Sequence, residues 1–201
     1  MTDKRATTLV PIHDLIARRW SGRAFDPGKS VHRAQLLALL EAARWAPSCF
    51  GDEPWHFIVW DRFRSEFGWQ KAFDCLQPGN QLWAMNAPVL VLSLAAIQFR
   101  ERERANRWAQ YDTGAAAVSL CLQASAMGLM AHQMGGFDSE RARVSFAVPS
   151  AYQPMAMIAV GHPGPEQMLE GELRVRELAP RTRQPLGANC FEDQWGASFN
   201  R

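Results

Sequence analysis

Three arginines stand close together in the stretch RRWSGRAF, residues 18–25, around a serine and a glycine. Guanidinium groups bind phosphate oxygens in pairs, and a serine hydroxyl adds a neutral donor. The simpler interpretation is that Arg18 and Arg19 end a helix and interact favourably with its negative end. Because a helix C-terminus repels anions, the arginine side chains must supply the attraction if this stretch holds one.

A second pair of arginines lies near the other end of the chain, in PRTRQPL, residues 180–186. Side chains two residues apart in an extended segment point to the same face, so Arg181 and Arg183 can act together. A solvated tail is the plain alternative. The functional hypothesis is that both arginine pairs converge on one phosphate.

The loop WAPSCFGDEPWHF, residues 45–57, combines prolines with small residues between a helix and a strand. Such a loop can present backbone donors and acceptors to a flat ring, although a tight structural turn explains it as well. A second hypothesis makes Cys49 a nucleophile with His56 as its base. The sequence carries no sign of thiol activation that favours this hypothesis.

Two glycines follow a strand-like segment in HQMGGFD, residues 132–138. They allow the backbone to approach a ligand closely. Alone this is a weak signal, and Asp138 also suits the N-cap of a following helix.

The elements that must position these residues are indicated by hydrophobic periodicity. The run at 87–96 is continuously apolar, which is typical of a strand buried on both faces. Ser30 and Pro47 bracket one helix, and Gly128 ends another. Helices are expected at 9–19, 31–46, 63–76, 106–128 and about 139–146, and strands at 56–60, 87–96, 129–134 and 154–161. Because helices and strands interleave without a linker, we expect one domain over residues 1–201, with a short lead at 1–8.

The segment 163–201 is rich in proline, arginine and glycine, and it has little periodicity. It is too long for an ordinary loop, yet it carries several large apolar residues that a disordered segment would lack. We therefore expect this C-terminal extension to lie along a partner subunit.

The composition of the chain argues against several classes of function. With 22 basic and 20 acidic residues the net charge is +2, which argues against a nucleic-acid or membrane-surface binder. No apolar run is long enough to span a membrane, and the first residues lack the apolar core of a signal peptide, so a cytoplasmic protein is expected. The four cysteines lack metal or redox spacing and the five histidines do not cluster, so no metal site is expected.

Taken in order, these motifs resemble those of the nitroreductase family of flavoproteins, over roughly residues 12–195. RRWSGRAF is similar to the family's Arg-x-Ser-x-Arg opening, and APSCFGDEPWHF to its Ala-Pro-Ser loop. GNQLWAMNAPVLVL, YDTGAAAVSLCLQASAMGLMAHQMGGFD and RTRQPL follow in register. The resemblance implies an α+β fold with a central mixed or antiparallel sheet sandwiched by helices, in an intertwined homodimer with FMN at the interface.

The resemblance also implies the roles of individual residues. The first arginine stretch is expected to contact the FMN phosphate and the edge of the ring, and the arginines of the tail are expected to complete the phosphate pocket. The Ala-Pro-Ser loop of the partner chain is expected to line the ring. The glycine loop is expected to bring its backbone up to the ring. The residues implied are, in that order, Arg19, Trp20, Ser21 and Arg23; Arg181 and Arg183; Ser48, Cys49 and Phe50; and Gln133, Met134, Gly135 and Gly136, with Asn80 bonding the flavin or its ribityl chain.

One loop departs from the family pattern, since Gly51 and Glu53 stand where Asn and Gln are usual. An ionised glutamate accepts hydrogen bonds but cannot donate them. A carboxylate near the ring would oppose the negative charge of reduced flavin. Glu53 therefore turns away from the ring, is protonated, or lowers the reduction potential of the flavin.

The function implied by the resemblance is an FMN-dependent oxidoreductase with no catalytic side chain. NADH or NADPH would supply hydride, and a nitroaromatic, a quinone or a similar flat small molecule would accept electrons in the same slot, in a ping-pong mechanism. Two alternatives remain open: a flavoprotein of the same fold with another task, such as dehydrogenation, dehalogenation or flavin breakdown, and a binding module with no cofactor.

Overall fold

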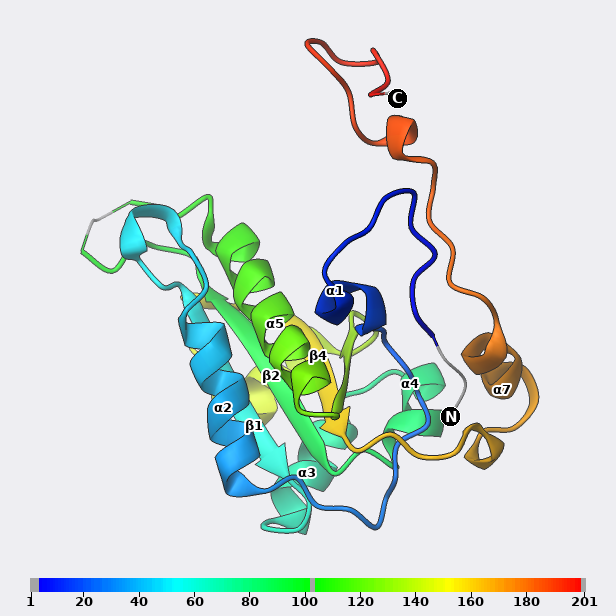
Figure 1. The fold of residues 1–201 in the computed structure, drawn as a ribbon. Coiled ribbons are helices and arrows are strands. Elements are labelled where there is room, and N and C mark those ends of the chain that lie inside the picture. Colours follow the sequence, from blue (N-terminus) through cyan, green and yellow to red (C-terminus); the bar gives the residue numbers. More distant parts are fainter. Residues whose placement is uncertain (1–3, 102–103, 200–201) are drawn as a thin grey trace.

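The computed structural model describes residues 4–101 and 104–199 (Figure 1). Its centre is an antiparallel sheet with the strand order β1-β2-β4-β3. The strands are β1 (Trp55–Asp61), β2 (Val89–Ala96), β3 (Met130–Met134) and β4 (Tyr152–Gly161). The helices are α1 (Asp14–Arg18), α2 (Arg33–Arg44), α3 (Glu66–Phe73), α4 (Pro78–Ala84), α5 (Ala109–Ala126), α6 (Ser139–Ser145) and α7 (Gly171–Leu178). Three short 3-10 turns are η1 (Cys49–Gly51), η2 (Glu166–Met168) and η3 (Leu186–Ala188).

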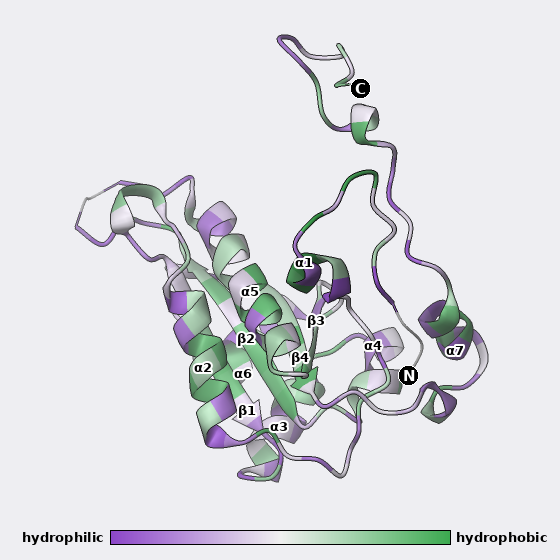
Figure 2. Ribbon diagram, in the orientation of Figure 1, coloured by the Kyte–Doolittle hydropathy of each residue, from purple (hydrophilic) through white to green (hydrophobic). Residues whose placement is uncertain are grey.

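Strand β2 shows why the sheet lies between two layers of helices. Successive side chains of a strand point to opposite faces. Leu90 and Leu92 therefore pack into one core with residues of α3, α4 and α6, whereas Val89 and Val91 pack into a second core with residues of α2 and α5. Figure 2 shows the hydrophobic colour of this central strand. The α+β class, the antiparallel sheet, its covering helices and the doubly buried strand at 87–96 are thereby confirmed.

Helix α5 packs along α2 and against the sheet through small residues, among them Ala116, Ala117 and Ala124. Small side chains let two helices approach closely. The opposite face of α5 carries Tyr111 and Val118, which are exposed. The chain by itself thus leaves a hydrophobic helix face in contact with water.

Several predicted boundaries are wrong for local reasons. The helix expected at 9–19 covers only α1, because Pro11 disfavours helical geometry before it and the side chain of His13 caps the backbone N–H of Leu15. Helix α2 begins at Arg33 instead of near Ser30. Its N-cap is His32, whose backbone N–H donates to the Gln35 side chain.

Two helices occupy segments for which the sequence predicts none. Helix α4 lies between the helix expected at 63–76 and the strand expected at 87–96, and Pro78 occupies its first position, which suits proline. Helix α7 lies in the C-terminal extension. Beyond α7 the chain runs past α1 and away from the sheet and its helices (Figure 1). Among the described residues no helix is long and apolar enough to cross a membrane.

Candidate functional site

The first arginine stretch follows directly after α1. The exposed side chain of Arg18 pairs with Asp14, with Nε 2.6 Å from Oδ2. Arg19 is the C-cap of α1, and its Nη1 donates to the Ser21 Oγ at 3.1 Å. The chain then turns inward at Gly22, which is buried.

Gly22 has to be a glycine because its neighbours leave no room for a side chain. A Cβ there would lie 2.3 Å from Met130 Sδ and 2.8 Å from the Trp20 ring. Its carbonyl oxygen lies 3.0 Å from Nδ1 of His132, and the His132 ring packs against Trp83 at 4.5 Å between centroids. The backbone that leads to Arg23 is therefore held from the sheet side.

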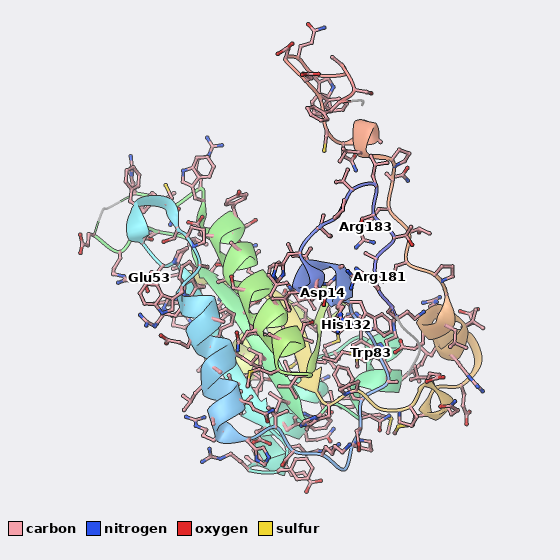
Figure 3. The ribbon with its side chains drawn as sticks, viewed as in Figure 1. Asp14, Glu53, Trp83, His132, Arg181 and Arg183 are labelled. Atoms are coloured by element: carbon pink, nitrogen blue, oxygen red, sulfur yellow. The ribbon has the colours of Figure 1, made fainter. Side chains whose placement is uncertain are left out.

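Of the two C-terminal arginines, Arg181 lies beside α1 and Arg19, whereas Arg183 is exposed and its Nη1 donates to the Thr182 carbonyl at 2.8 Å. Arg181 Nη1 donates to the carbonyl oxygens of Lys4, at 2.7 Å, and Ala17, at 2.8 Å, and so ties the tail to the N-terminal segment and to α1. Burial lowers the pKa of Arg181, and the positive charges of Arg19 and Arg183 lower it further. Figure 3 shows Arg181 and Arg183 beside α1.

The positive charges of the first arginine stretch also act on His132. Its pKa is lowered from 6.5 to about 4, chiefly because the ring is buried; the hydrogen bond to Gly22 opposes this lowering, and the charges of Arg23 and Arg19 add smaller contributions to it. Arg19 therefore links the two segments, because its charge acts on His132 together with that of Arg23 and on Arg181 together with that of Arg183. A bound anion would relieve the mutual repulsion of these arginines. This donor set fits a phosphate group.

The glycine loop after β3 is anchored by Asn80 of α4. Its Nδ2 donates to the Gly136 carbonyl at 2.9 Å, and the backbone N–H of Gln77 donates to the same oxygen at 3.0 Å. A Cβ on Gly136 would lie 2.7 Å from Asn80 Nδ2, whereas one on Gly135 would meet open space. Asn80 thus holds the loop in this structure.

The residues before the glycines differ in what they can offer. Gln133 is exposed, and its Nε2 lies 3.5 Å from the Sγ of Cys121. The side chain of Met134 is buried in the core, so only its backbone can face a ligand. The half-buried Trp20 lies under the ammonium group of Lys4, 5.4 Å from its Nζ.

The Ser48–Phe50 loop lies elsewhere. The backbone N–H of Cys49 donates to the buried Asp112 carboxylate at 3.0 Å, and Ser48 Oγ accepts the N–H of Glu53 at 3.1 Å. Phe50 is exposed, with a positive φ of 58°. In Figure 3 the nearby Glu53, also exposed, lies far across α2 and α5 from Arg181 and Arg183. A single chain does not bring this loop to the arginines.

The structure does not support the hypothesis that His56 is the base for a Cys49 nucleophile. Nδ1 of His56 lies 3.2 Å from the Pro54 carbonyl oxygen, and its ring packs on Tyr152 at 4.6 Å between centroids. Within residues 4–101 and 104–199, no hydrogen bond joins His56 to Cys49.

Sequence reasoning missed two residues of the site. Glu177 of α7 accepts hydrogen bonds from the backbone of Arg23 and Ala24, and His132 holds Gly22. No signal pointed to Glu177, because α7 itself was not predicted. His132 could have been suspected, since a histidine inside an otherwise apolar strand must find a polar partner.

Comparison with known proteins gives a consistent result. The model of the family described as "Nitroreductase family" matches residues 16–67 and 64–162. A crystal structure described as an oxidoreductase containing FMN superposes with a TM-score of 0.91 and 31% identity, covering 98% of this chain and 99% of the other.

Two relatives are similar in sequence. An uncharacterized 15.4 kDa protein of Mycolicibacterium smegmatis is 38% identical over 121 residues, which is 60% of this chain and 80% of the relative. The major NAD(P)H-flavin oxidoreductase of Aliivibrio fischeri is 44% identical over 48 residues, 24% of this chain and 22% of the relative.

Proposed function

The chain belongs to the nitroreductase family, and on that premise we propose that it reduces nitroaromatics, quinones and similarly flat acceptors with electrons from NAD(P)H by a ping-pong mechanism. The protein is an FMN-dependent NAD(P)H oxidoreductase. When bound, FMN supplies the hydride and electron chemistry, and the chain supplies binding, orientation and charge.

The observation that carries the proposal is the meeting of the two arginine pairs. Arg181 bonds the carbonyl of Ala17, 164 residues away in the sequence, and its pKa is lowered by the charge of Arg19. Arg19, Arg23, Arg181 and Arg183 bind the FMN phosphate, with the Ser21 hydroxyl as a neutral donor. A dianionic phosphate turns their repulsion into attraction.

The flavin ring is held by backbone and by a second subunit. The Gly135–Gly136 loop, fixed by Asn80, brings its backbone to one side of the ring. The Ser48–Phe50 loop of the partner lines the other side, since within one chain this loop is remote from the arginines (Figure 3).

Exposed apolar side chains support a homodimer. They lie on the outer face of α5, on α2, in the loop before α1, which Figure 2 shows as strongly hydrophobic, and on the tail. They include Leu9, Val10, Ile12, Leu37, Tyr111, Val118, Leu186 and Trp195. Exposed apolar side chains in such number are typical of proteins that associate, and in this proposal the tail lies along the partner.

A visible spectrum before and after adding NADPH tests the function. We expect flavin bands that bleach and return when a quinone or nitroaromatic is added. A colourless chain that takes up no FMN indicates a binding module. Flavin bands without NAD(P)H oxidation by any acceptor indicate a flavoprotein with another task.

The phosphate assignment has its own test. The double variant Arg19→Ala, Arg23→Ala should lose FMN while the chain still folds, and Arg18→Ala should keep it because Arg18 pairs with Asp14 in solvent. Flavin content per chain after gel filtration measures both. Unchanged flavin content in the double variant rejects the assignment.

A further inference from the structure

Glu177 is a carboxylate buried in an unfavourable place. Its side chain is 5% exposed, and it stands in the last turn of α7. Burying a charge costs free energy, and a negative charge near a helix C-terminus adds repulsion from the helix dipole. Contacts elsewhere must offset both costs.

Those contacts are made to the backbone of the first arginine stretch. Oε1 accepts hydrogen bonds from the N–H groups of Arg23, at 3.1 Å, and Ala24, at 3.2 Å, and Oε2 accepts from the Arg23 N–H at 3.0 Å. The Arg23 guanidinium is more distant, with Nη1 4.0 Å from Oε2. Glu177 therefore binds mainly the backbone N–H of Arg23 and only weakly its guanidinium group.

Glu177 also stands next to the second arginine pair. Arg181 follows it by four residues, a stretch of chain that spans at most about 14 Å. Gly22 makes the close approach possible, since a Cβ there would lie 3.1 Å from Oε1. One carboxylate thus joins the segment that carries Arg23 to the segment that carries Arg181 and Arg183.

We propose that Glu177 is a positioning residue for the phosphate site, which it serves by fixing the backbone of Arg23 relative to the C-terminal arginines. The inference rests on the proposed phosphate assignment. It predicts that removing Glu177 weakens FMN binding, which is the opposite of what the charge of Glu177 alone would predict. A carboxylate close to an anion site weakens anion binding by its charge, so a charge effect alone would make its removal tighten binding.

The test compares two flavins that differ only in the phosphate. FMN and riboflavin are titrated into the full chain after removal of flavin, with flavin fluorescence as the signal. Glu177→Ala should weaken FMN binding roughly 10- to 100-fold, the worth of hydrogen bonds to a charged group, and leave riboflavin binding unchanged. Glu172→Ala is the matched control, because Glu172 lies exposed on the same helix and pairs with Arg176.

Several outcomes overturn the inference. FMN binding in Glu177→Ala as tight as in the wild type, or tighter, refutes positioning. An equal loss of FMN and riboflavin affinity shows a general structural role instead. If Glu177→Ala does not fold, Glu177→Gln replaces it. In Glu177→Gln, Oε1 still accepts from the backbone of Arg23 and Ala24, but the nitrogen that replaces Oε2 is a donor and faces the Arg23 N–H, so one bond is lost. FMN should therefore bind more weakly than to the wild type, and equal or tighter binding refutes the idea.

The proposed function fails separately. A wild-type chain that binds neither flavin refutes the phosphate assignment and the inference built on it. A wild-type chain that binds FMN more tightly than riboflavin supports the assignment whatever Glu177 does.

Discussion

Replacing His132 by a residue that does not titrate should make the free energy of unfolding less dependent on pH below pH 7. His132 is held between the Gly22 carbonyl and the Trp83 ring, and its pKa is lowered from 6.5 to about 4. A folded-state pKa below the unfolded one means that the unfolded chain binds the proton more readily. The stability contributed by neutral His132 is therefore fully present above pH 6.5 and is lost as the pH falls through 4.

The size of the effect follows from the shift. One pKa unit corresponds to about 1.4 kcal/mol, so the whole shift corresponds to about 3 kcal/mol. Between pH 7 and pH 5 the free energy of unfolding should fall by about 2 kcal/mol through this group alone. Urea denaturation of the flavin-free chain at both pH values, at one protein concentration, measures the fall.

Two variants isolate the group. His132→Asn keeps a side-chain N–H donor for the Gly22 carbonyl but does not titrate, so the fall between pH 7 and pH 5 should shrink by about 2 kcal/mol. His56→Asn changes an exposed histidine and should reproduce the fall of the wild type. If His132→Asn shows the full wild-type fall, the burial argument is wrong.

Two further outcomes are expected. Gly136→Ala should lower the free energy of unfolding by about 1 kcal/mol, because its Cβ displaces Asn80 Nδ2 from the hydrogen bond to the loop, whereas Gly135→Ala meets open space and should not. Comparison of urea midpoints decides this, and equal midpoints contradict it. Truncation after Pro185 removes the outlying tail but keeps the arginines, so the dimer should weaken in sedimentation velocity. A truncated dimer as stable as the full-length one excludes the tail as a partner contact.

The central strands could be predicted from the sequence because their patterns have one physical explanation. An apolar run such as 87–96 has to be buried on both faces, and β2 is. Helix α5 was predicted by its length and its ending at Gly128, where φ is +70°. Which of its faces lies inward could not be predicted, because the helix is apolar nearly all round and its periodicity does not choose a side.

The charged residues of the proposed phosphate site could be named from the sequence, but the residues that hold their backbone could not. Arginine pairs stand out in a sequence, and Arg19 and Arg181 do lie in one region of the structure. Glu177 has no such signature, because its partners are backbone N–H groups that no side-chain pattern reveals. Helix α7 also escaped prediction, because it is short and polar, and packing rather than intrinsic propensity stabilises such helices.

The bonds from Arg181 to the carbonyls of Lys4 and Ala17 have a consequence for how the protein is made. During synthesis the N-terminal segment emerges first, yet the residue that fastens it emerges more than 160 residues later. Until then the nascent chain carries only Arg19 and Arg23 of the four arginines of the proposed phosphate site. Ribosome-bound chains and prematurely terminated ones should therefore be unable to retain the cofactor, and cofactor retention should distinguish chains whose synthesis has passed Arg183.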